Sequence, residues 1–174
     1  MTKNVVKFIM SPFVALVLTV SCGVVYKTTQ TENVNQAPKT NLRTDIISHA
    51  KTYVHTRYRY ASTNPNKGFD CSGFSSFILN RYGFDIPRST AGQSSLGRKI
   101  KLHEVQEGDL IFFGKRRRVS HVALVVKNDN GNITVVHSTN SKGVIVENIN
   151  QSNYWKKRVL FARDVVSTST EREN

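Results

Sequence analysis

Cysteine is scarce in this chain of 174 residues, and the two that are present lie far apart. Cys22 closes an N-terminal hydrophobic stretch, so Cys71 is the only thiol in the part of the chain expected to fold. Cys71 has no intrachain disulfide partner there, so its presence calls for a chemical explanation. A lone thiol followed by two histidines in strand-like segments, His121 and His137, is typical of a cysteine-nucleophile site.

Acidic residues are also few, with 12 Asp and Glu against 25 Lys and Arg, which gives a formal net charge of +13. The basic clusters at residues 115–118 and 156–158 lie between apolar strand-like runs. We interpret them as solvated loops, because they form neither a basic helix nor an aromatic-rich repeat. No nucleic acid is expected as a partner. An anionic polymer such as a carboxylate-rich cell wall would suit this charge as well as DNA does.

Long hydrophobic runs are absent except at the N-terminus. There, Lys3 and Lys7 precede an apolar segment at residues 8–20, followed by a small residue and Cys22. The segment is too short for a comfortable transmembrane span and has the layout of a secretory signal peptide.

The end of this leader, residues 18–22, resembles a bacterial lipoprotein lipobox, in which the cysteine becomes the lipid-bearing first residue. Thr19 departs from the usual leucine three places before the cysteine, and an ordinary signal peptide with an incidental Cys22 is the alternative. Gly23, in place of aspartate, resembles an outer-membrane address. We therefore expect a periplasm-facing lipoprotein held at the outer membrane by a lipid anchor.

The rest of the chain is long enough for one domain with a real core and short for two, at 39% hydrophobic content. It contains no internal repeat. We expect a leader at residues 1–21, a lipidated cysteine and flexible polar tether at 22–43, a folded domain at 44–166 and a polar tail at 167–174.

Within the domain, the periodicity of apolar residues predicts helices first and strands afterwards. A first helix is expected after the N-cap pair Thr44 and Asp45, a second from Cys71 to a stop at Gly83, and a short third at residues 89–96. Alternation then predicts five strands, at residues 110–113, 119–127, 133–138, 144–149 and 159–164. Residues 129–132, Asp-Asn-Gly-Asn, predict a tight hairpin between the second and third strands. The fold class is α+β, with helices packed on a mostly antiparallel sheet.

This order places Cys71 at a helix N-terminus, with Asp70 suited to cap it. The unpaired N–H groups there carry roughly half a positive charge, so we expect the pKa of the thiol to be lowered. Ser72 and Gly73 keep the first turn small and leave room for a substrate carbonyl beside the Cys71 backbone N–H. The alternative is a buried, inert thiol.

The histidines lie on the same faces as apolar residues of their strands. Period two places His121 with Ala123 and Val125, and His137 with Val135. Because the predicted hairpin pairs these strands, the two imidazoles can lie side by side and hydrogen-bond. Each alone would be read as a satisfied core histidine. Zinc is a rival for Cys71, His121 and His137, but no clustered Cys or His spacing supports a metal site, and no cofactor is expected.

Six ordered motifs resemble those of the NlpC-type cell-wall peptidases, over about residues 45–165. They are Tyr58-Arg59-Tyr60, Gly68-Phe69-Asp70-Cys71-Ser72-Gly73-Phe74, Ile86-Pro87-Arg88-Ser89-Thr90-Ala91-Gly92-Gln93, Gly108-Asp109-Leu110-Ile111-Phe112-Phe113, Ser120-His121-Val122-Ala123 and His137-Ser138. The resemblance implies a papain-like bacterial enzyme that cleaves peptidoglycan stem peptides.

The same resemblance assigns roles to single residues. It implies that Cys71 is the nucleophile, His121 the base and His137 the third polar member, with Tyr58 helping to form the oxyanion site. Two positions depart from the family pattern, because Arg57 stands where proline is common and Ala61-Ser62 replaces a usual glycine pair. Both lie before the cysteine, where they bear on substrate fit.

The expected reaction is acyl transfer to Cys71, with His121 withdrawing the thiol proton or storing it beside a resting thiolate. His137 would hold the His121 ring in the productive tautomer, and Arg88 would receive carboxylates of a stem peptide. The bond cut is either the one between D-glutamate and diaminopimelate within a stem or a cross-link between stems. An amidase or acyltransferase of the same fold, or a wall-binding module without catalysis, are the alternatives.

Overall fold

The computed structural model describes residues 41–167. The predictions of a leader, a lipidated Cys22 and most of the tether and tail fall outside these residues. Helix α1, Leu42–Lys51, begins earlier than the sequence predicted. Its cap is Asn41, whose side chain accepts a hydrogen bond from the Arg43 N–H, and not the pair Thr44 and Asp45. The domain therefore begins inside the segment expected to be tether.

A two-stranded hairpin and two further helices follow α1. Strands β1, Thr63–Asn64, and β2, Gly68–Phe69, pair antiparallel just before α2, Cys71–Asn80. Helix α2 ends three residues before Gly83, whose φ of +83° closes the turn that follows. The short helix α3, Thr90–Ser94, is capped by Ser89, close to its predicted position.

The second half of the domain forms one six-stranded sheet in the order β3-β8-β4-β5-β6-β7, with every neighbouring pair antiparallel. Five of its strands match the predicted segments: β4, Leu110–Lys115; β5, Arg118–Asp129; β6, Asn132–Thr139; β7, Gly143–Asn148; and β8, Val159–Asp164. The sixth, β3, Arg98–Ile100, was not predicted. A 3-10 turn at Leu102–Glu104 and the short helix α4, Asn153–Lys156, complete the domain. The predicted α+β class is confirmed.

The hairpin between β5 and β6 has the predicted turn. Asp129 pairs with Asn132, and the two residues between them, Asn130 and Gly131, have φ values of +51° and +88°. Both values lie in the left-handed region that a two-residue hairpin turn with the favoured twist requires. This turn sets the two histidine-bearing strands side by side.

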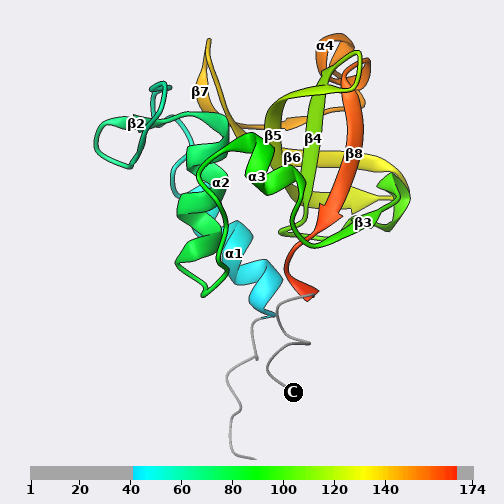
Figure 1. Ribbon diagram of the computed structural model, residues 1–174, viewed down its shortest axis with the longest axis horizontal. Helices are drawn as coiled ribbons and strands as arrows, with labels where there is room; N and C mark the ends of the chain where they lie inside the picture. The colour runs from blue at the N-terminus through cyan, green and yellow to red at the C-terminus, as the bar shows by residue number, and fades with distance from the viewer. Residues whose placement is uncertain (1–40, 168–174) are drawn as a thin grey trace, which may run out of the picture. The chain divides into compact units, whose positions relative to one another are not determined.

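Both faces of the sheet carry buried apolar residues. Helices α1 and α2 lie to one side of it, and the short α4 lies at one end (Figure 1). The core on the helical side contains Phe74, Ile78, Leu124 and Val136. The opposite face carries a second cluster of buried residues, which comprises Ile100, Val105, Ile111, Phe113, Ala123, Val125, Ile133, Val135, Ile149 and Ala162. The alternation predicted for β5 and β6 is therefore confirmed.

Candidate active site

Cys71 is the first residue of α2, as predicted, and Asp70 caps the helix. The Asp70 Oδ1 atom accepts a hydrogen bond of 2.7 Å from the Gly73 N–H. Gly73 itself is required here, because a Cβ at this position would lie 2.2 Å from the Ser62 carbonyl oxygen. The helix can start at the cysteine because a capping carboxylate precedes it and a residue without a side chain lets the neighbouring loop approach.

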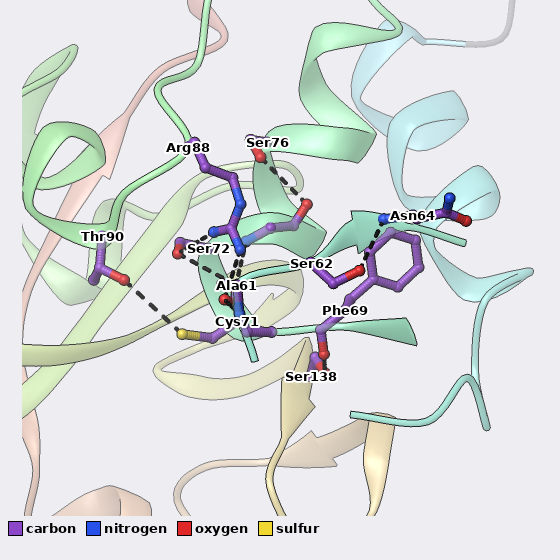
Figure 2. Close-up of polar contacts among 12 residues, drawn as sticks. Ala61, Ser62, Asn64, Phe69, Cys71, Ser72, Ser76, Arg88, Thr90 and Ser138 are labelled. Carbon is purple, nitrogen blue, oxygen red and sulfur yellow. Dashed lines mark hydrogen bonds and ion pairs between the residues drawn. The ribbon is translucent and has the colours of Figure 1, made fainter. Parts of the chain in front are cut away.

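The other Asp70 oxygen anchors two neighbours. Oδ2 accepts hydrogen bonds from the Ala61 N–H at 2.8 Å and from Arg88 Nη2 at 2.6 Å. Arg88 Nη1 also donates to the Ser72 hydroxyl at 3.1 Å (Figure 2). Ser72 and Arg88, both predicted at the site, thus belong to the network that holds the start of α2. The contact of Arg88 with a substrate carboxylate stays a prediction.

The Cys71 thiol lies close to a residue that the sequence analysis missed. Sγ is 3.9 Å from the hydroxyl oxygen of Thr90, the first residue of α3 (Figure 2). Burial raises the pKa of the Cys71 thiol, and Asp70 adds to this, while hydrogen bonds from the Val122 backbone and from Thr90 act in the opposite direction. Desolvation therefore outweighs these hydrogen bonds, and the expected lowering of the Cys71 pKa is wrong.

His121 and His137 come together as predicted. His121 Nε2 lies 2.8 Å from His137 Nδ1, and both rings are buried. Next to His137, the Ser138 hydroxyl donates a hydrogen bond of 2.7 Å to the Phe69 carbonyl, two residues before Cys71 (Figure 2). This bond joins the strand of His137 directly to the segment that leads into the cysteine helix.

Two residues beside the histidine pair were also missed. His137 Nε2 lies 2.7 Å from Glu147 Oε1 on β7, and Trp155 Nε1 donates to the same oxygen at 2.8 Å. The Trp155 ring stacks on His121, with centroids 4.5 Å apart and planes at 28°. A signal for Glu147 existed, because period two places this acid on the same face as the apolar residues Ile145 and Ile149. For Trp155 the only signal was that it is the single tryptophan.

The environment keeps His121 neutral. Burial lowers the pKa of His121 to about 3, and the neighbouring His137 adds to this effect. The hydrogen bond from His137 lowers the pKa of Glu147, although partial burial opposes it. At neutral pH the site therefore holds a thiol, an uncharged His121 imidazole and an ionised Glu147 carboxylate.

Two cavities share one lining residue, Ser120. One, of about 450 Å³, is lined by Cys71, Tyr58 and Ser120 together with Asp70 and Arg88. The other, of about 560 Å³, is lined by Ser120 and His121 together with Glu147, Trp155, Lys142 and Arg158. Within residues 41–167, no hydrogen bond joins Cys71 Sγ to either histidine. The thiol and the base thus face neighbouring cavities that share one residue.

The two departures from the expected motif lie on the wall of the thiol cavity or next to it. Ala61, which lines this cavity, has a φ of +55°, a left-handed conformation that favours glycine. Arg57 accepts a hydrogen bond from the Phe69 N–H through its carbonyl oxygen, and its side chain donates from Nε to the Lys67 carbonyl. Gly68 fits because a Cβ there would lie 2.4 Å from the Arg57 carbonyl oxygen.

The described residues, 41–167, contain no group of three His, Cys, Asp or Glu side chains arranged to hold a metal ion. The same part of the chain has no helix that is long and apolar enough to cross a membrane.

The sequence profile of the NlpC/P60 family matches residues 55–164, which include Tyr58, Cys71, His121, His137 and Glu147. The chain belongs to the NlpC/P60 family. The resemblance inferred from the motifs is thereby confirmed. The NlpC/P60 domain of this chain carries the whole of the geometry described above.

Named relatives support this assignment. The chain is 33% identical over 141 residues to the murein DD-endopeptidase MepS/murein LD-carboxypeptidase of Escherichia coli K12, covering 80% of this chain and 72% of the relative. It is 33% identical over 126 residues to the gamma-DL-glutamyl hydrolase of Bacillus subtilis 168, covering 70% of this chain but 30% of that protein. The match therefore spans less than a third of the Bacillus relative.

Solved structures show the same fold. An NlpC/P60 family protein from Bacillus cereus superimposes with a TM-score of 0.65 at 30% identity, over 72% of this chain and 40% of that one. The NlpC/p60 domain of the peptidoglycan hydrolase SagA gives a TM-score of 0.57 at 30% identity, over 68% of this chain and 95% of the SagA domain. The predicted papain-like arrangement is thus confirmed.

Proposed function

We propose that this NlpC/P60 protein is a cysteine endopeptidase that hydrolyses peptide bonds in the stem peptides of peptidoglycan. One observation carries the proposal. A thiol at a helix N-terminus and a buried, hydrogen-bonded pair of histidines, His121 and His137, lie at two neighbouring cavities that have Ser120 in common. The name of the Escherichia coli relative, a murein endopeptidase, supports the substrate class, and the name of the Bacillus subtilis relative supports hydrolysis of a glutamyl bond. The net charge of +13 suits a polymer rich in carboxylates.

The reaction begins from a neutral thiol and a neutral imidazole. Burial raises the pKa of Cys71 and lowers that of His121, so an ion pair is disfavoured before substrate binds. His121 takes the thiol proton as Sγ attacks the scissile carbonyl, and a tetrahedral intermediate forms. This requires Sγ to turn from Thr90 towards His121 when substrate fills the cavity. Catalytic hydrogen bonds commonly tighten only in such a complex.

The remaining steps use groups around the thiol. The Cys71 backbone N–H, in the first turn of α2, is a donor for the oxyanion, and the Tyr58 hydroxyl on the same cavity is a second. His121 then protonates the leaving amine, and a water molecule hydrolyses the thioester. Arg88, which lines the cavity, would bind a stem-peptide carboxylate with the N–H groups that do not donate to Asp70 and Ser72.

The bond cut is either the D-glutamyl–diaminopimelate bond within a stem or a cross-link between stems. Digestion of purified peptidoglycan, followed by mass spectrometry of the released fragments, distinguishes the two, because the first shortens stems and the second converts dimers to monomers. Cys71→Ala should release no fragments and keep the circular dichroism spectrum. Equal release by the variant would overturn the cysteine mechanism. Binding without release by the wild type would leave a wall-binding module, and acyl exchange without hydrolysis would indicate an acyltransferase.

We further propose that the protein is a lipoprotein anchored through Cys22, facing the periplasm from the outer membrane. The support is the leader pattern that ends in Ser21-Cys22-Gly23. The mature protein should begin at Cys22 and partition into detergent, whereas Cys22→Ser should be neither acylated nor cleaved. An intact, water-soluble protein with an unmodified Cys22 would remove the anchor from this account.

A further inference from the structure

We infer that Glu147 is a positioning residue that fixes the tautomers of both histidines, leaving His121 Nδ1 as the atom that accepts a proton. The inference deepens the proposed function and rests on it for the role of His121. Glu147 contacts neither Cys71 nor the reacting atoms. It acts through His137, with 2.7 Å between His137 Nε2 and Glu147 Oε1.

The direction of each hydrogen bond follows from the chemistry of the groups. An ionised carboxylate can only accept, and an indole N–H can only donate. Glu147 is ionised at neutral pH because the hydrogen bond from His137 lowers its pKa. His137 therefore carries its proton on Nε2 and donates it to Glu147, while Trp155 Nε1 donates to the same oxygen at 2.8 Å.

The next bond in the chain is then determined. With one proton on its ring, at Nε2, His137 offers a lone pair at Nδ1. His121 Nε2 lies 2.8 Å from that atom and must carry the proton that the bond requires. A neutral His121 protonated at Nε2 has its free lone pair at Nδ1, and so it can act as a base. Loss of the Glu147 carboxylate would free His137 to protonate Nδ1, which would turn His121 Nε2 into the acceptor and block the base.

The carboxylate has a second effect once the thiol proton has moved. The proton leaves Cys71 Sγ and forms a bond with His121 Nδ1, which produces an imidazolium. Glu147, two hydrogen bonds away, stabilises that charge without itself taking the proton. The other titratable or charged groups that line the cavity of His121 and Glu147 are Lys142 after β6, Tyr154 on α4 and Arg158 before β8, while Cys71 on α2 lines the neighbouring cavity.

Trp155 determines how a substitution at Glu147 should behave. In Glu147→Gln the amide can present either its oxygen or its NH₂ group to His137. Because the Trp155 N–H donates to the same position, it favours the oxygen there and so preserves the tautomer. Glu147→Gln therefore loses only the charge, whereas Glu147→Ala loses the acceptor. In the double variant Glu147→Gln/Trp155→Phe, the amide is free to turn and select the wrong tautomer.

The first test compares kcat, KM and the pH profile of peptidoglycan cleavage in the full-length protein. We expect kcat to fall about 10-fold in Glu147→Gln and about 100-fold in both Glu147→Ala and the double variant, with KM within about twofold. The acidic limb of the kcat/KM profile should move to lower pH in Glu147→Gln, because a carboxylate that raises the basicity of the pair is lost. Glu104 is an exposed acid on the 3-10 turn, and the control variant Glu104→Gln should have the kcat, KM and pH profile of the wild type.

The second test reads the tautomers directly and does not depend on activity. Two-bond ¹⁵N–¹H correlations of labelled histidine should show Nε2 protonated on both rings in the wild type and in Glu147→Gln, and should lose this pattern in Glu147→Ala. Assignment comes from His121→Asn and His137→Asn. Unchanged histidine tautomers in Glu147→Ala would overturn the inference. So would a loss of activity in the Glu147 variants that goes with a lower melting temperature and leaves the acidic limb of the kcat/KM profile in place. An inactive wild type with the expected tautomers would instead count against the proposed function.

Discussion

The Arg43 guanidinium donates a hydrogen bond of 2.8 Å to Asp109, the residue that leads into β4. Its other terminal nitrogen lies 3.0 Å from Asp164, the last residue of β8. Arg43 belongs to the first turn of α1, and its side chain is 12% exposed. One nearly buried cation thus ties the N-terminal helix to two strands of the sheet.

Replacing Arg43 should therefore strongly destabilise the domain. Arg43→Met leaves two buried carboxylates without their shared cation, which costs about 3–5 kcal/mol. Arg98→Met is the matched control, since Arg98 pairs with the same Asp164 but its side chain is 64% exposed, and the loss should stay below about 1 kcal/mol. The free energy of unfolding in urea measures both. Equal, small losses would show that the buried pair contributes no more than the exposed one.

Two buried groups, His121 and Asp109, should contribute in opposite directions to the pH dependence of stability. Burial lowers the pKa of His121 from 6.5 to about 3, so the unfolded state binds the proton more tightly. The stability that the protein gains by keeping His121 neutral is fully present above about pH 6.5 and is lost as the pH falls towards 3. Burial raises the pKa of Asp109 from 3.8 to about 6, so the native state binds that proton more tightly, and stability is lost as the pH rises from 3.8 to 6.

Single variants separate the two contributions between pH 4 and 6. His121→Asn should lose less stability on acidification than the wild type, because the histidine no longer takes up a proton on unfolding. Asp109→Asn should lose more, because the compensating group is gone. Urea denaturation at several pH values gives the slopes, and a shift of both slopes in the same direction would contradict these assignments.

His137 should tolerate asparagine better than alanine. An asparagine side chain can accept from His121 Nε2 with its oxygen and donate to Glu147 with its NH₂ group, whereas alanine can do neither. We expect His137→Asn to keep at least about 10-fold more single-turnover acylation activity than His137→Ala. His121→Asn and His121→Ala serve as the comparison and should be equally inactive. If both His137 variants lost the same amount of activity and His121→Asn stayed partly active, His137 would be the base and His121 the residue that orients it.

Ala61→Gly should stabilise the protein. A left-handed alanine costs about 1–2 kcal/mol, and the greater freedom of glycine in the unfolded chain takes back about 0.4–1 kcal/mol. The φ of +55° at Ala61 therefore predicts a net gain of about 0.5–1 kcal/mol in the free energy of unfolding. Ala91→Gly, in the ordinary helical conformation of α3, should instead lose about 1 kcal/mol. A loss in both variants would mean that the loop holds Ala61 without strain.

Local chemistry explains why much of the fold could be predicted. The cap at Asp70 and the turn at Asn130-Gly131 depend on neighbours only a few residues away, and each of the five predicted strands has an apolar pattern within its own segment. The start of α1 was wrong by a few residues, because Asn41 caps it in place of the equally suitable Thr44 or Asp45. Strand β3 escaped prediction because its two exposed cations, Arg98 and Lys99, show no apolar alternation, and it exists only by pairing with β8 far along the chain.

The sequence by itself pointed to the residues of the candidate site, because the thiol of Cys71, two histidines on apolar faces and six ordered motifs can be recognised from the order of residues alone. Tertiary structure alone decided the environment of those residues. It brought Glu147 and Trp155 to the histidine pair, set Thr90 beside the thiol and buried Cys71 enough to raise its pKa against the helix N-terminus. Desolvation and hydrogen-bond partners depend on what packs against a residue, and segments distant in the chain supply that packing.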